Sequence, residues 1–65
     1  MTDLLPVTLD DQIACVCREI GIREKTYPHW INSGKMRLDM ADLEIARMEA
    51  VLKTLLDLKS AGVVA

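Results

Sequence analysis

The chain has 65 residues, of which 51% are hydrophobic and 28% charged, and its formal net charge is -2. A chain of this length holds one small domain, and its apolar content is typical of a folded protein. With one Trp, one Tyr and no Phe it lacks a stacking platform for single-stranded nucleic acid, and with one His and two Cys it offers too few ligands for a metal or cofactor site.

Residues 1–7 are expected to form an N-terminal arm that precedes the domain. This segment carries no basic region and only a short apolar run, which is unlike a secretory signal peptide. No stretch of the chain approaches the roughly 20 consecutive apolar residues of a membrane span. We therefore expect a cytoplasmic protein with no membrane partner.

A first helix is predicted to begin at Thr8, which acts as N-cap with Asp11 at the third helical position. Apolar residues then recur at steps of three and four, as on the buried side of a packed helix. Gly34 is a natural stop, and Lys35 beyond it suits the negative end of the helix dipole. The stripe consists of Leu9, Ile13, Val16, Ile20, Arg23, Tyr27 and Trp30.

Pro28 disagrees with a continuous first helix. It has no backbone donor and clashes with the preceding turn, at a cost of about 3 kcal/mol inside a helix. It also disfavours helical dihedrals at Tyr27. The sequence therefore predicts a pronounced kink or a break, in which Pro28 would open a short separate helix.

A second helix is predicted to start at Arg37, Leu38 or Asp39 and to end at Gly62. Residues 63–65 form a short tail, so the domain spans residues 8–62. The stripe of this helix is wide, because further apolar residues lie beside it. It consists of Leu38, Ala41, Ile45, Met48, Leu52 and Leu55, with Val51, Leu56 and Leu58 alongside.

The two stripes predict an all-α fold, an antiparallel helical hairpin that turns at residues 34–37. In such a hairpin Trp30 would face Ala41 and Tyr27 would face Ile45. Two helices of this size bury too small a core to be stable alone, so we expect a helical-bundle homo-oligomer, most simply a dimer. Its interface is assigned to Val51, Leu55, Leu56 and Leu58.

Arg23 stands in the apolar stripe at a position that otherwise calls for a leucine. We expect it to pair across the hairpin with Glu44 or Glu49, and the alternative is a cation that faces a partner. Cys15 and Cys17 point about 200° apart on a helix, so they are expected to be reduced and semi-buried, with at most one well covered.

Charge is distributed unevenly along the chain. Residues 18–37 hold five basic and two acidic side chains, a balance of +3, whereas the rest holds three basic and eight acidic ones, a balance of -5. The only aromatic residues lie in this basic segment, either closing the end of the hairpin or serving as an exposed anchor. Residues assigned to partner binding are Arg18, Arg23, Lys25, Tyr27, His29 and Trp30.

Residues spread over most of the chain form a recognisable pattern, namely Arg18-Glu19-Ile20, Arg23, Tyr27-Pro28, Trp30-Ile31, Gly34-Lys35-Met36, Asp42, Glu44-Ile45 and Met48-Glu49-Ala50. This pattern resembles that of a group of short helical proteins encoded by tailed bacteriophages and prophages. The resemblance covers about residues 13–52 and is most specific at residues 27–30 followed by residues 34–36. It implies a small helical phage-type protein in a bacterial host cell, without an assigned activity.

We expect a non-enzymatic protein–protein interaction module that self-associates and binds a host or phage protein. The alternative is a DNA-binding regulator with a helix-turn-helix at residues 17–35, in which Gly21 would occupy the turn and Lys25 would begin the recognition helix. Pro28 within that helix and the acidic remainder of the chain oppose the alternative.

Overall fold

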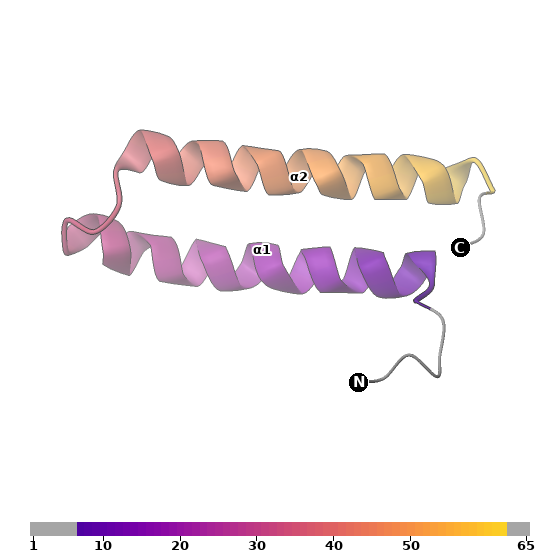
Figure 1. Cartoon of the computed structure of the whole chain (residues 1–65), viewed down its shortest axis with the longest axis horizontal. Coiled ribbons are helices and arrows are strands. Elements are labelled where there is room, and N and C mark those ends of the chain that lie inside the picture. The colour runs from indigo at the N-terminus through magenta and orange to yellow at the C-terminus, as the bar shows by residue number, and fades with distance from the viewer. Residues whose placement is uncertain (1–6, 63–65) are drawn as a thin grey trace.

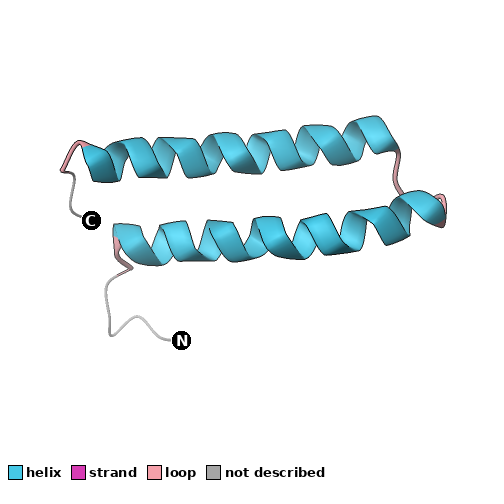
Figure 2. Ribbon diagram, turned by 180° about the vertical axis from the view of Figure 1, so that it is seen from behind, coloured by secondary structure: helices cyan, strands magenta, loops and turns pink. Residues whose placement is uncertain are grey.

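The computed structural model describes residues 7–62 and shows two helices, α1 (Leu9–Asn32) and α2 (Leu38–Ser60). They lie side by side and run antiparallel, joined by residues 33–37 (Figure 1). Seen from behind, the described residues contain helix and loop and no strand (Figure 2). The predicted all-α hairpin is confirmed. Residues 1–6 of the predicted arm and the predicted tail, residues 63–65, lie outside the described residues.

The start of α1 is held by a reciprocal pair of hydrogen bonds, as its sequence predicts. The backbone N–H of Asp11 donates to the Thr8 hydroxyl over 3.0 Å, and the backbone N–H of Thr8 donates to the Asp11 carboxylate over 3.2 Å. Two backbone donors that helix geometry leaves without a partner are satisfied in this way.

Both helices end at glycines in the left-handed region, which glycine adopts without the steric cost that a Cβ would bring. Gly34 has φ 78° and Gly62 has φ 83°. After Gly34 the chain turns back, and the N–H of Lys35 donates to the carbonyl of Trp30 over 2.8 Å. The predicted stops are confirmed, and α2 takes the earliest of its three predicted starts, with Arg37 as N-cap.

Of the two outcomes predicted at Pro28, the break is wrong, because α1 runs as one helix from Leu9 to Asn32, and the pronounced kink stays a prediction. Pro28 is exposed, so it does not interrupt the side of α1 that packs on α2. Pro28 has no N–H to donate to the carbonyl of Glu24, four residues earlier. That carbonyl can accept a hydrogen bond from water instead. The packing of Tyr27 and Ile31 on either side of Pro28 favours a continuous helix over two separate ones.

Pro28→Ala should therefore stabilise the hairpin. The alanine restores one helical hydrogen bond and removes the clash, although the unfolded chain gains entropy when proline is lost. We expect the free energy of unfolding in urea to rise by about 1–2 kcal/mol. A decrease would mean that Pro28 itself packs in the folded protein.

The core lies between the helices and is small. Its buried residues are Leu9, Ile20, Tyr27 and Ala41, and the other inward positions are half-buried. Among these half-buried residues are Ile13, Val16, Ile45, Met48, Leu52 and Leu55, so most of both predicted stripes face inward.

The closed end of the hairpin differs from the prediction. Trp30 is 43% exposed and Leu38 is 62% exposed, so Trp30 does not close the hairpin over Ala41. Apolar residues that alternate at steps of three and four repeat every 3.5 residues on average, whereas an α-helix makes one turn every 3.6 residues. The stripe therefore drifts around the helix by about 20° for every seven residues. At the end of α1 the inward position has therefore moved from Trp30 to Ile31, which is half-buried.

Candidate functional site

The six residues predicted to bind a partner do not form one surface. Tyr27 is buried, and Arg23 is half-buried. Arg18, Lys25 and His29 are exposed and, at spacings of seven and four, share the side of α1 that faces away from α2. Trp30 lies on a flank between these two sides.

Arg23 forms an ion pair within α1 and not across the hairpin. Its guanidinium donates to the Glu19 carboxylate over 2.7 Å and to the Glu19 carbonyl over 3.3 Å. The hydrogen bond to the Glu19 carboxylate raises the pKa of Arg23. The expected pairing with Glu44 or Glu49 is wrong: a partner four residues away is already within reach, and Glu44 pairs with Arg47 over 2.7 Å.

The two aromatic residues stack on each other at one flank of the closed end. Their ring centroids are 5.8 Å apart and their planes differ by 30°. Tyr27 is 8% exposed and Trp30 is 43% exposed, so the inner ring belongs to the core and the outer ring reaches the surface. With Glu19, Ile22, Arg23 and Thr26 they line a shallow depression of about 250 Å³.

The residues predicted to form the oligomer interface fall on different sides of α2. Val51 and Leu58 are exposed and seven residues apart, which places them on one flank. Leu56 is exposed too, but it is rotated by about 140° from Val51. Leu55 is half-buried between the helices.

One side of the hairpin carries four of the nine large exposed apolar side chains of the described residues. We call this the apolar face. On each helix these residues are rotated about the helix axis away from the direction that faces the other helix, and the sense of rotation is the same on both. In an antiparallel pair, residues rotated in the same sense lie on the same side of the pair, so the exposed flank of α1 lies beside that of α2. The apolar face consists of Trp30, Met40, Val51 and Leu58, each 40–47% exposed.

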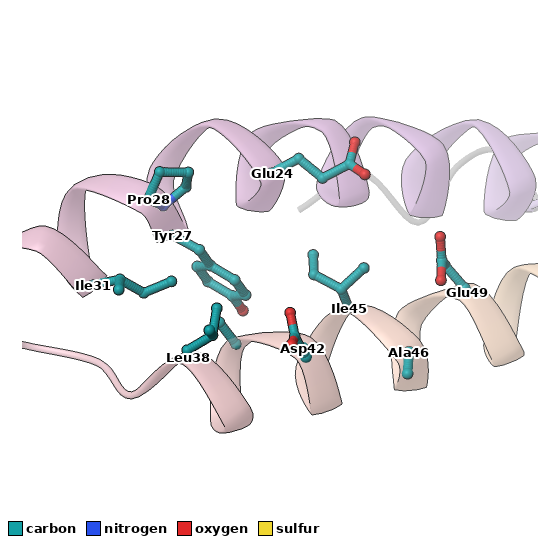
Figure 3. A pocket seen from close by; sticks show the side chains of 10 residues that line it. Glu24, Tyr27, Pro28, Ile31, Leu38, Asp42, Ile45, Ala46 and Glu49 are labelled. Carbon is teal, nitrogen blue, oxygen red and sulfur yellow. The ribbon is translucent and has the colours of Figure 1, made fainter.

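The opposite side holds a groove between the helices at the closed end, with a volume of about 470 Å³. Figure 3 shows side chains of α1 and α2 pointing toward one another across it. Its apolar lining comes from Tyr27, Pro28, Ile31, Leu38, Ala41, Ile45 and Ala46, and its carboxylates from Glu24, Asp42 and Glu49.

Sequence reasoning missed this groove. Its signal is the spacing of Asp42 and Glu49, seven residues apart at one edge of the α2 stripe, with the small Ala46 between them. Only the position of α1 shows that a third carboxylate, that of Glu24, comes to the same groove.

Within residues 7–62, no three His, Cys, Asp or Glu side chains converge as metal ligands. Cys15 and Cys17 are free thiols and both are exposed. The expected semi-buried cysteines are therefore wrong, because the pair straddles Val16, the inward residue, and both partners turn to solvent. In the part of the chain that is described, no helix has the length and apolar content to cross a membrane.

Comparison of the chain with models of protein families, with curated proteins and with solved structures finds no match. The resemblance to short phage and prophage proteins therefore stays a prediction. The turn that a helix-turn-helix would need at Gly21 is not present in residues 17–35, because Gly21 lies inside α1.

Proposed function

We propose that this protein is a non-enzymatic protein–protein interaction module that self-associates and binds a second protein, as a phage-type protein in the bacterial cytoplasm would. The proposal rests on a comparison of the buried residues with the large hydrophobic side chains that stay exposed. Among residues 7–62, four residues are buried, whereas nine large hydrophobic side chains are at least 40% exposed. Four of the nine lie on the apolar face, and exposed apolar surface gathered on one side of a small protein is typical of an interface.

The apolar face is the surface that suits a second copy of the chain. Charged side chains beside it neutralise each other in two ion pairs, Arg23 with Glu19 and Arg47 with Glu44. A two-fold dimer places the same surface of both copies in contact, so a surface without net charge avoids repulsion between like charges. Val51 and Leu58 of the predicted interface lie on this face.

Sedimentation equilibrium over a concentration series tests self-association. We expect the wild-type chain to approach twice the mass of one chain. The double variant Val51→Asp/Leu58→Asp should raise the dissociation constant by well over 100-fold, since each of the two copies loses two apolar contacts of about 1.5 kcal/mol each and gains two buried charges.

The matched control is Leu43→Asp/Leu56→Asp, which changes the net charge equally at exposed leucines outside the apolar face. It should associate like the wild-type chain. A wild-type chain that stays folded and monomeric at every concentration would contradict the proposal, and equal losses in both double variants would move the interface elsewhere.

A further inference from the structure

The carboxylates of the described residues divide into two groups. Of the nine in residues 7–62, six have a partner within the hairpin: Asp11 accepts from the Thr8 N–H, and five form ion pairs. The remaining three, Glu24, Asp42 and Glu49, form no ion pair, and all three line the groove. Negative charge that the hairpin leaves uncompensated is therefore concentrated around one apolar depression.

The groove has the dimensions of a helix-binding site. Its α2 wall runs from Leu38 to Glu49, about 16 Å at 1.5 Å per residue, which matches roughly three turns of a third helix. Asp42 and Glu49 are seven residues apart, so their carboxylates follow one edge at a spacing of about 10 Å, or two helical turns. Ala46, at the exposed α2 edge of the groove, carries no side chain that would obstruct an incoming helix.

We propose that this groove binds an amphipathic helix of a partner protein, whose apolar side chains fill the groove and whose Lys or Arg residues lie two turns apart against Asp42 and Glu49. Glu24 supplies a third negative charge from the α1 side. The occupant is thus identified by its charge and periodicity, as in other complexes in which a helix binds a hydrophobic groove. This inference rests on the proposed function as an interaction module and names the kind of partner.

The charge of the groove favours such a partner over a second copy of the chain. A two-fold axis through the groove would bring three unpaired carboxylates toward three more, which opposes association at neutral pH. A basic helix brings the opposite charge. The apolar face, on the other side of the hairpin, stays available for self-association while the groove is occupied.

The test uses a fluorescently labelled synthetic helix of about 14 residues, with leucines at spacings of three and four and lysines seven apart. Anisotropy is recorded against the full-length protein. We expect saturable binding that weakens as salt is added. Asp42→Asn/Glu49→Gln should weaken it by up to roughly 30-fold, since each of the two exposed ion pairs contributes up to about 1 kcal/mol.

A second variant, Ala46→Trp, should weaken binding by placing a large ring at the α2 edge of the groove, where the incoming helix would lie. Controls are matched in each case: Asp10→Asn/Asp57→Asn removes two paired carboxylates outside the groove, and Ala50→Trp adds the same ring at an exposed position outside the groove. Both should bind the peptide as the wild-type chain does. Circular dichroism confirms that every variant remains helical.

The inference is overturned if the lysine peptide shows no binding, if a peptide with glutamates in place of its lysines binds equally well, or if the controls lose as much affinity as the groove variants. If Ala46→Trp lowers the mass measured by sedimentation, the groove would instead be the place where a second copy of the chain binds. Loss of self-association in Val51→Asp/Leu58→Asp with intact peptide binding would separate the two surfaces, so either proposal can fail alone.

Discussion

Leu52→Asp is expected to unfold the hairpin. Leu52 is half-buried on the stripe of α2 that packs against α1. The change removes about 2 kcal/mol of apolar burial and places a charged carboxylate at a partly buried apolar position, for a total of roughly 3–5 kcal/mol. A domain of this length has about 3–10 kcal/mol of stability in all. Circular dichroism should show most of the helical signal lost, and sedimentation should show a monomer.

Leu43→Asp is the matched control, because Leu43 lies on the same helix with 41% of its surface exposed. Its free energy of unfolding should stay within about 0.5 kcal/mol of the wild-type value. A fully helical, monomeric Leu52→Asp protein would show that the two stripes do not form the core.

Tyr27→Ala is expected to have the second large effect. Tyr27 is the largest buried side chain, and its ring stacks on Trp30 at 5.8 Å. Truncating a buried aromatic residue costs about 3–5 kcal/mol through lost burial and the cavity left behind. We expect the midpoint of urea unfolding to fall sharply, and the near-ultraviolet circular dichroism of Trp30 to weaken as its stacking partner is lost.

Tyr27→Phe separates packing from the hydroxyl group. It keeps the ring and therefore the stack, so the free energy of unfolding should fall by no more than about 1 kcal/mol. Equal effects of the alanine and phenylalanine variants would mean that the hydroxyl, and not the ring, stabilises the closed end.

These variants also separate the two sides of the molecule. The core positions Leu52 and Tyr27 should affect folding, whereas the apolar face and the groove should affect only association and peptide binding. A small hairpin can serve both contacts at once because each lies between the helices on its own side. Binding of either partner would add burial that the hairpin lacks alone, and would raise its apparent stability.

Local sequence signals determined the two helices and their ends. The cap at Thr8, the turn glycines Gly34 and Gly62 and most of the two stripes are confirmed, whereas Trp30 and Leu38 of the stripes are exposed. Each of these depends on residues within about four positions along the chain, where helix geometry fixes which groups meet. Pro28 was the local signal that failed, because packing on both sides of it outweighed its cost.

The tertiary structure alone decided what lies on each side of the hairpin. The drift that turns Trp30 outward and the pairing of Arg23 with Glu19, four residues away, are by contrast properties of α1 by itself that the sequence prediction missed. Glu24 joined Asp42 and Glu49 at one groove only because α1 packs on α2 at a particular rotation. That rotation depends on how two sets of side chains fit together, and a periodic pattern along one chain does not contain it.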